Sequence, residues 1–313
     1  MALVECIANV SEGRDAGVIA RFADSIRSVP GIALLDIHTD PDHHRSVLTF
    51  VGGRRPVEEA AYRLIVIAAA SIDLTRHRGV HPRIGAADVM PLVGLAGVTS
   101  GDLVASARRL AVRVGREARV PAYLYGDAAT SPERRLLRAV RSGQFERLRV
   151  AVRLDPDRIP DAGPRELHPT AGAVAIGVRG PLVAYNVWLE EDDVGAARSI
   201  AAAVRESSGG LPGVQAMGVP LASRGHAQVS MNLMRPFEVG MLEAFERVEQ
   251  LAREQRVTID RSELVGLAPA ELLDADIAAR IRLPEFDPQQ QLLEPAVERA
   301  TGVVLPDGAL RPA

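Results

Sequence analysis

The chain has 313 residues, 47% of them hydrophobic and 25% charged, which is long and apolar enough for two globular domains and excludes a largely disordered chain. Its formal net charge of −3 gives no general attraction to nucleic acid or to an anionic membrane, and no apolar run approaches the ~20 residues of a membrane span, so we expect a cytoplasmic protein that binds small molecules. The sequence contains no lysine and a single cysteine, Cys6, which excludes a Schiff-base or phosphate-loop lysine, an internal disulfide and a zinc site built from several cysteines.

The first half of the chain predicts alternating strands and helices. The spacing of Val18, Phe22 and Ile26 predicts one buried helix face, and Pro30 followed by Gly31 predicts the end of that helix. In chain order we predict a strand at 3–9, a helix at 15–29, strands at 32–37 and 46–51, a helix at 57–72, a strand at 88–93, a helix at 102–118 and a strand at 122–125. The first six elements follow the β-α-β-β-α-β order of a ferredoxin-like fold.

A boundary is predicted after an arginine-rich helical stretch and the proline-rich segment LDPDRIPDAGP. It divides the chain into an N-terminal subdomain at 1–165 and a C-terminal subdomain at 166–313. In the second subdomain we predict strands at 182–189, 214–219, 227–233 and 264–267 and helices at 194–205 and 237–255, the last with Pro236 as its start signal. Because the order β-α-β-β-α-β repeats, the expected fold class is α+β with two ferredoxin-like subdomains.

The predicted strand AQVSMNL at 227–233 alternates between apolar and polar residues. Its apolar residues belong to a core face, and Gln228, Ser230 and Asn232 point the opposite way. Solvent exposure is the usual fate of such a polar face in an open sheet. If two such sheets line a cleft between the subdomains, the polar face could instead hold a ligand rich in donors and acceptors.

Five of the seven histidines lie in the two short polar segments HTDPDHHRS and RHRGVHPRIG. They are His38, His43, His44, His77 and His81. The spacing of the last two suits a helical zinc pair, but Gly79 and Pro82 argue against a helix. Asp40 and Asp42 could complete a mixed site for metal-assisted hydrolysis. Because histidine titrates near neutral pH, the same loops could instead accept and return a proton within one catalytic cycle.

Eight stretches along 3–273 resemble the glutamate formimidoyltransferase family, in the order in which that family carries them. The most specific is RHRGVHPRIGAADVMP. The others are ECIANVSEGRD, DPDHHRSVLTFVG, PAYLYGDAA, AGPRELHPTAGAVAIGVR, VAYNVWL, AQVSMNL and SELVGLAP. Among the departures from the family pattern, His44 stands where asparagine is common, and Trp188 replaces a polar residue of animal members. An imidazole at position 44 would alter acceptor choice or the pH optimum if it touches the ligand.

The resemblance implies transfer of a formimidoyl group between N5 of 5-formimidoyltetrahydrofolate and the amine of L-glutamate, a step of histidine breakdown, with tetrahydrofolate as co-substrate. It also implies that the folate lies in a cleft between the two subdomains, and that the chain forms a homodimer, as family members commonly do. By position, His81 matches the family's catalytic histidine. The stretch that matches the family's folate-binding segment comprises Gly163, Pro164, Arg165, Glu166, Leu167, His168, Pro169, Thr170, Ala171 and Gly172. No stretch resembles the cyclodeaminase domain that is fused to some relatives, so the product is expected to be released for another enzyme.

The implied reaction suggests a role for each candidate residue. His81 would take a proton from the attacking amine and return it to N5 as tetrahydrofolate leaves. A catalytic carboxylate, with Asp40 and Asp42 as the candidates, would steady the cationic intermediate, and no metal is needed. Arg45 and Arg83 are candidates for clamping the two carboxylates of glutamate. Other substrate-binding candidates are Asn9, Ser11, Glu12, Asn186, Gln228, Ser230 and Asn232.

Three alternatives stay open at this point. The first is formyl or formimidoyl transfer to another amine such as glycine, the second a metal-dependent hydrolase built on the histidine clusters, and the third a folate carrier without activity. Separately, four arginines crowd the helical stretch before the predicted boundary, and a solvated helix face is favoured there over a site for a polyglutamyl folate tail. They are Arg134, Arg135, Arg138 and Arg141.

Overall fold

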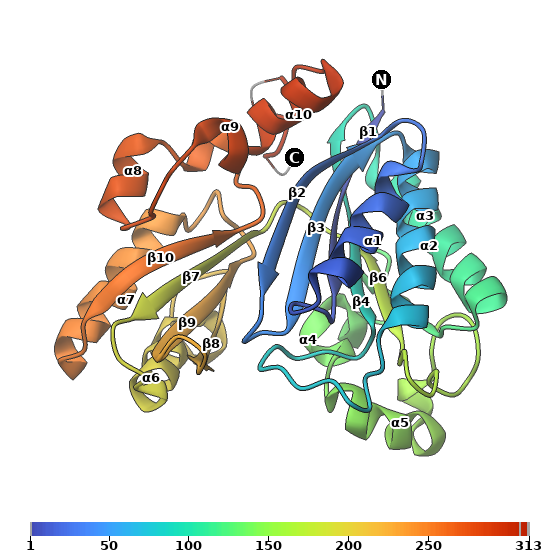
Figure 1. The fold of residues 1–313 in the computed structure, drawn as a ribbon, viewed down its shortest axis with the longest axis horizontal. Helices are drawn as coiled ribbons and strands as arrows, with labels where there is room; N and C mark the ends of the chain where they lie inside the picture. The colour runs from blue at the N-terminus through green and yellow to red at the C-terminus, as the bar shows by residue number, and fades with distance from the viewer. Residues whose placement is uncertain (1, 307, 312–313) are drawn as a thin grey trace. The chain divides into compact units, whose positions relative to one another are not determined.

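A computed structural model describes residues 2–306 and 308–311 and divides the chain into two compact units, Met1–Arg179 and Gly180–Ala313 (Figure 1). Each unit contains one β-sheet with helices packed against it, which confirms the prediction of a mixed fold with two sheets. Among the described residues, no helix has the length and apolar character needed to cross a membrane.

The first unit is built around a six-stranded sheet in the order β2-β3-β1-β4-β6-β5. Its strands are β1 (Leu3–Val10), β2 (Ile32–Asp40), β3 (Arg45–Gly52), β4 (Ala87–Ala96), β5 (Ala122–Gly126) and β6 (Val174–Val178). Its helices are α1 (Ala16–Arg27), α2 (Arg54–Ser71), α3 (Ser100–Arg113), α4 (Leu137–Val140) and α5 (Gln144–Leu154), and a π-helical turn η1 (Val114–Ala118) continues α3. The strands β2, β3, β1 and β4 pair antiparallel with one another, whereas β6 runs parallel to its two neighbours, β4 and β5.

Local signals in the sequence explain the start of this unit. The side chain of Asp15 caps α1 by accepting a 3.0 Å hydrogen bond from the backbone N–H of Val18, and the predicted apolar helix face is buried. The helix ends before Gly31, whose φ of 78° suits glycine. Helices α1, α2 and α3 pack on one face of the sheet, where β1 contributes Val4, Cys6, Ala8 and Val10 to the core. The opposite face of the sheet therefore carries the alternate residues, among them Asn9 and Arg45.

The boundary between the units lies later in the chain than the predicted division at 165/166. Residues 174–178 form β6, a strand that the sequence patterns did not predict, because VAIGV is short and contains a glycine. β6 pairs with both β4 and β5 and so completes the first sheet. Residues 166–179 consequently belong to the first unit, and the second unit begins at Gly180.

The second unit is built around a four-stranded antiparallel sheet in the order β10-β7-β9-β8. Its elements are β7 (Val183–Leu189), α6 (Val194–Val204), β8 (Val214–Leu221), β9 (His226–Leu233), α7 (Met241–Gln255) and β10 (Ile259–Val265), followed by α8 (Ala275–Arg280), α9 (Pro288–Gln291) and α10 (Leu293–Thr301). The first six follow the predicted order. The predicted start of α7 at 237 is wrong, because the N–H groups of Glu238 and Val239 bond to the carbonyl of Arg235 in a turn and the helix begins only after Gly240. The strand predicted at 264–267 begins earlier, at Ile259.

The predicted alternation along β9 is confirmed. Its apolar residues pack in the core with α6 and α7; they are Ala227, Val229, Met231 and Leu233. Gln228, Ser230 and Asn232 therefore lie on the sheet face that α6 and α7 do not cover.

Candidate active site

A hairpin loop presents the first pair of histidines. The strands β2 and β3 pair so that Asp40 lies opposite Arg45, and the loop at 41–44 carries His43 and His44. The Oδ1 atom of the buried Asp40 accepts a 2.6 Å hydrogen bond from the backbone N–H of His43, as aspartates at the start of tight turns often do. His44 adopts a left-handed backbone with φ of 51°. One contact of Asp40 therefore fixes the hairpin, and its catalytic role stays a prediction.

The SEGR motif places a carboxylate next to this hairpin. Oε1 of Glu12 accepts hydrogen bonds from the backbone N–H groups of Gly13, Arg14 and Asp15 at 2.9, 2.7 and 3.0 Å, and lies 3.2 Å from Nε2 of His44. Burial alone would raise the pKa of the Glu12 carboxyl, but these backbone donors and His44 outweigh burial and lower it. Glu12 is thus a fixed anion that organises the loop around it.

Two neighbours of Glu12 are also structural in this arrangement. The hydroxyl of Ser11 donates a 2.7 Å hydrogen bond to the carbonyl of Gly85, and the backbone N–H of Ser11 donates to the carbonyl of Ala86 at 2.8 Å. A Cβ atom at Gly13 would lie 2.3 Å from the carbonyl oxygen of Asp40, so no other residue fits there. Ser11 and Gly13 therefore lock the end of β1 against the loops that carry the histidines.

His44 is held between two acceptors. Its Nδ1 lies 3.0 Å from the carbonyl oxygen of Arg78, and its Nε2 faces the carboxylate of Glu12. Because neither oxygen can donate, both contacts are hydrogen bonds only when the ring carries both protons. The ring stacks on His77 with centroids 4.1 Å apart and an interplanar angle of 9°.

His77 is held as one neutral tautomer. Nε–H of Arg83 can only donate, and it lies 3.2 Å from Nδ1 of His77, so Nδ1 must be the unprotonated acceptor. Nε2–H then donates to the carbonyl of His44 at 2.9 Å. Burial lowers the pKa of His77 to about 4, against the opposing effect of the hydrogen bond to the carbonyl of His44, and the charge of Arg83 acts in the same direction as burial.

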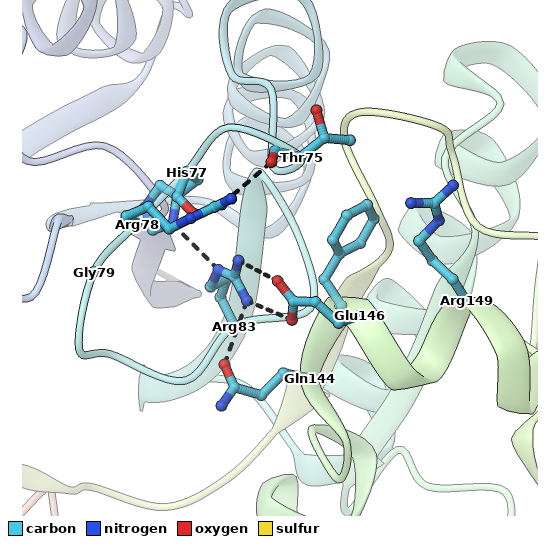
Figure 2. Close-up of a pocket in the computed structure, with 9 residues that line it drawn as sticks. Thr75, His77, Arg78, Gly79, Arg83, Gln144, Glu146 and Arg149 are labelled. Atoms are coloured by element: carbon cyan, nitrogen blue, oxygen red, sulfur yellow. Dashed lines mark hydrogen bonds and ion pairs between the residues drawn. The ribbon is translucent and has the colours of Figure 1, made fainter.

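Arg83 is anchored rather than poised to clamp a substrate carboxylate. Nη1 and Nη2 donate to the two oxygens of Glu146 at 2.9 and 2.7 Å, Nη1 also donates to Gln144 at 3.3 Å, and only 7% of Arg83 is exposed. Figure 2 shows this guanidinium between the loop of His77 and the start of α5. The pocket around it is lined by Thr75, His77, Arg78, Gly79, Arg83, Gln144, Phe145, Glu146 and Arg149. Since Arg83 already uses four donor contacts, the contacts favour a positioning role.

His81 lies in the loop between α2 and β4, close to the hairpin. The N–H of Val80 donates to the carbonyl of Asp42 at 3.1 Å, and the His81 ring centroid lies 6.1 Å from that of His43. Burial lowers the pKa of His81 well below its usual value, and the charges of Arg45 and Arg141 lower it further. The ring is therefore neutral at neutral pH and can accept a proton.

Two arginines surround this base, and only one of them was expected. Nη1 of Arg45 donates to Oδ1 of Asn9 at 3.1 Å, which joins two predicted substrate-binding residues. Arg141, which the sequence placed on a solvated helix face, pairs through Nη2 with the buried Asp88, and its side chain is only 15% exposed. Oδ1 of Asp88 also accepts the backbone N–H of Ile84 at 2.7 Å. Arg45 and Arg141 thus supply the positive charges that act most strongly on His81.

The predicted folate segment forms a compact loop beside the loop at 73–83, which carries His81. The backbones of His168 and Gly172 bond to each other in both directions, at 2.9 and 3.0 Å, and Nδ1 of His168 accepts the N–H of Ala171 at 3.0 Å. The carbonyl of Thr170 accepts from the N–H of Leu74 at 2.8 Å. Burial lowers the pKa of His168. The segment from 163 to 172 therefore lies in the first unit, next to the loops that carry the histidines.

A second polar cluster lies in the other unit. Oε2 of Glu263 on β10 accepts hydrogen bonds from Nδ2 of Asn186 at 2.9 Å, Nε2 of Gln228 at 3.1 Å and Nε1 of Trp188 at 3.3 Å. Since a carboxylate only accepts, both amides must turn their NH₂ groups toward it and their carbonyl oxygens elsewhere. The sequence predicted Asn186 and Gln228 as binding residues but did not single out Glu263. Ser230, opposite Asn186, and Asn232 share this sheet face.

The geometry gives no support to the metal hypothesis. Among the described residues, no three side chains of the histidine, cysteine, aspartate or glutamate type converge as ligands of one metal ion. The two histidines of the stacked pair, His44 and His77, direct their ring nitrogens at protein groups. His44 and His77 are therefore held by hydrogen bonds within the protein.

Together these features put a neutral imidazole close to arginines in the first unit, an arrangement typical of the proton-transfer site of an enzyme. Comparison with known proteins makes this specific. The N-terminal subdomain model of the formiminotransferase domain matches residues 3–179, and a second formiminotransferase domain model matches residues 184–280. The chain belongs to the formiminotransferase family, which confirms the resemblance seen in its sequence.

Curated relatives include enzymes of the same length. A glutamate formimidoyltransferase of Streptococcus pyogenes is 42% identical over 292 residues, which cover 93% of this chain and 97% of the relative. One of Thermoplasma acidophilum is 39% identical over 305 residues, covering 97% and 100%. The formimidoyltransferase-cyclodeaminase of mouse is 39% identical over 87% of this chain, but the match covers only 51% of that longer protein.

Proposed function

We propose that this chain is a glutamate formimidoyltransferase, which moves a formimidoyl group between 5-formimidoyltetrahydrofolate and L-glutamate in histidine degradation. The family assignment carries the proposal, together with one observation: a neutral His81 among positively charged arginines. Tetrahydrofolate is the co-substrate of this family and links the reaction to one-carbon metabolism. We expect the enzyme to work in the cytoplasm, as the relatives from a bacterium and an archaeon suggest.

The reaction exchanges one C–N bond for another. The amine nitrogen of glutamate bonds to the formimidoyl carbon, the bond from that carbon to N5 breaks, and the amine proton finally resides on N5. Neutral His81 accepts the proton as the amine attacks and returns it to N5 as tetrahydrofolate leaves, a form of help worth roughly 10² to 10⁴ in rate. We assign Asp40 as the carboxylate that stabilises the cationic intermediate of this exchange. Its hydrogen bond to the backbone of His43 fixes the hairpin that carries it.

The charge around His81 suits a substrate with two carboxylates. We assign Arg45 and Arg141 to these carboxylates, with Asn9 beside Arg45, and leave Arg83 to its partner Glu146. In the free enzyme, burial and the two arginines keep His81 unprotonated. When the carboxylates of glutamate neutralise the arginines, the pKa of His81 rises, so the ring can hold the proton between the two transfers.

Folate recognition is assigned to both units. We propose that the segment 163–172 and the polar face of β7 and β9 bind the folate in a cleft between two ferredoxin-like subdomains. The order β8-β9-β7-β10 in the second unit repeats the order β2-β3-β1-β4 in the first, and the element order β-α-β-β-α-β supports this fold type. Glu263 orients the amides of Asn186 and Gln228 on this face, and such an array of polar groups suits a ligand rich in donors and acceptors, such as a pterin ring. We also expect a homodimer, which the mass of the purified protein in solution would test.

One assay tests the function directly. Purified protein is incubated with N-formimidoyl-L-glutamate and tetrahydrofolate, and the formation of 5-formimidoyltetrahydrofolate is followed, with N-formimidoylglycine as the competing donor. We expect product from the glutamate derivative and little from the glycine derivative, because only the former offers two carboxylates to the arginines. Equal rates with both donors would show that glutamate is not the preferred acceptor and would favour transfer to another amine. No product with either donor would contradict the proposed transferase activity.

A further inference from the structure

The loop at 73–83, called the His81 loop here, is fastened to the histidine hairpin on one side. His77 donates through Nε2–H to the carbonyl of His44, and the N–H of Val80 donates to the carbonyl of Asp42. The stacked rings of His44 and His77 add a flat contact between the two loops. These contacts hold the His81 loop at the hairpin without using the His81 ring.

On its other side, the end of the His81 loop is fastened to the start of α5. Arg83 makes a bidentate ion pair with Glu146, and its backbone carbonyl accepts the N–H of Phe145 at 3.0 Å. The Arg83 side chain is 8% exposed and that of Glu146 57% exposed, so the pair is shielded on the guanidinium side, and its bidentate geometry orients the guanidinium. The Nε–H of the same guanidinium points at Nδ1 of His77 (Figure 2). A continuous chain of hydrogen bonds therefore runs from α5 to the hairpin.

We propose that Glu146, Arg83 and His77 form a positioning relay for His81. Glu146 orients Arg83, the Nε–H of Arg83 keeps His77 in the Nε2–H tautomer, and His77 fixes the His81 loop to the hairpin. The three residues contact no reacting atom in this scheme; they hold the base where the amine must deliver its proton. The kinetic part of the inference rests on the proposed function.

Burial keeps the His77 ring neutral at neutral pH. The side chains of His44 and Arg83 also oppose its protonation, whereas the carbonyl of His44 and the carboxylate of Glu12 favour it. A proton on Nδ1 would break the contact with Arg83, because two donors would then face each other. The relay therefore needs a neutral ring at position 77, and glutamine is the residue that can copy it, with an amide oxygen toward Arg83 and an NH₂ group toward His44.

The first test compares two substitutions at His77. His77→Gln should keep most of kcat, whereas His77→Leu, which has neither contact, should lose on the order of 10²-fold in kcat with little change in the Kd for tetrahydrofolate. Arg83→Lys should resemble the leucine variant, because lysine can pair with Glu146 but has no second donor placed at His77. The matched control is Arg109→Lys, which weakens another partly buried ion pair, with Glu58, far along the sequence from these loops. The control should keep kcat.

Two results would overturn the relay. One is equal kcat for the glutamine and leucine variants when both are folded, as judged by circular dichroism. The other is a His77 ring that nitrogen NMR shows protonated at Nδ1 in the wild-type protein, which is a readout independent of any activity. If His77→Leu does not fold, Glu146→Gln takes its place and should likewise lower kcat. Wild-type protein with the expected tautomer but without transferase activity would contradict the proposed function and leave the tautomer assignment intact.

Discussion

The two units use one glutamate each to organise a polar cluster, but with different consequences. Glu12 in the first unit accepts three backbone N–H groups and faces a histidine, so it shapes loops that carry titratable rings. Glu263 in the second unit accepts three side-chain N–H groups from the neighbouring strands β7 and β9, so it orients amides on a flat sheet. The first arrangement suits proton transfer, and the second suits recognition of a ligand.

The difference follows from where each carboxylate stands. Loops can bury imidazoles next to arginines; burial lowers the pKa values of His77 and His81, and the arginine charges add to this effect. A strand can only repeat side chains at every second residue, which gives an ordered array of fixed acceptors and donors. We therefore expect substitutions in the first cluster to change turnover and substitutions in the second to change affinity.

The sharpest test of this division is His81→Ala. Loss of the base should lower kcat by roughly 10² to 10⁴, with the Kd for tetrahydrofolate nearly unchanged. Steady-state kinetics with N-formimidoyl-L-glutamate give kcat, single-turnover kinetics give the rate of the chemical step, and folate binding can be followed by protein fluorescence. The control His226→Ala removes an imidazole from the second unit, where it bonds the carbonyl of Leu189, and should keep kcat. An unchanged kcat in His81→Ala would show that His81 is not the catalytic base and would contradict a catalytic centre in the first unit.

The second prediction concerns stability at acid pH. Because the pKa of His77 is about 4 when folded and about 6.5 when unfolded, the unfolded chain binds more protons between these values. Stability from this group is complete above pH 6.5 and is lost as the pH falls toward 4, by about 3 kcal/mol. Urea unfolding of wild type and His77→Gln at several pH values measures it: the wild type should lose more stability on acidification. Parallel curves for the two proteins would contradict the neutral, buried ring.

Much of this fold was predictable from the sequence because its signals are local. The spacing of Val18, Phe22 and Ile26 and the alternation along β9 each act within a few residues, and the structure has them as predicted. The strand β6 was not predicted because its five residues resemble a loop until β4 and β5 are placed on either side. The domain boundary was misplaced for the same reason.

The candidate site was predictable only in part. Histidines in polar loops stand out, and so His77 and His81 were found. Glu146, Arg141 and Glu263 were missed because their partners lie far away in sequence: Arg141 pairs with Asp88, and Glu146 with Arg83. From sequence alone, a charged residue on a helix is expected to be solvated until its partner is known. For the same reason, the prediction that Arg83 clamps a substrate carboxylate did not include its ion pair with Glu146.

The third prediction tests the recognition side of the comparison. Glu263→Gln removes the charge that holds two amides and an indole N–H, and the orientation of the amides is lost. The Kd for tetrahydrofolate should rise about tenfold while kcat at saturation stays, since charge-assisted hydrogen bonds of this kind are worth about 1.5–3 kcal/mol. Glu206→Gln, which breaks an exposed ion pair with Arg235 in the same unit, is the matched control. If both variants bind folate like the wild type, the polar face of β7 and β9 is not part of the binding site.

The smallest effect is expected for Ser11→Ala. This substitution tests whether Ser11 in the first cluster has a structural role or contacts the substrate. The Ser11 hydroxyl bonds the carbonyl of Gly85 in a buried position, so its removal leaves that carbonyl without this partner and should cost about 1 kcal/mol of unfolding free energy. The KM for N-formimidoyl-L-glutamate should stay as it is, because the hydroxyl points at the protein backbone. Denaturant unfolding and steady-state kinetics on the same preparation give both numbers. A raised KM with unchanged stability would return Ser11 to the substrate-binding residues and would show that β1 contributes side chains, as well as a fixed end, to the chemistry of the first unit.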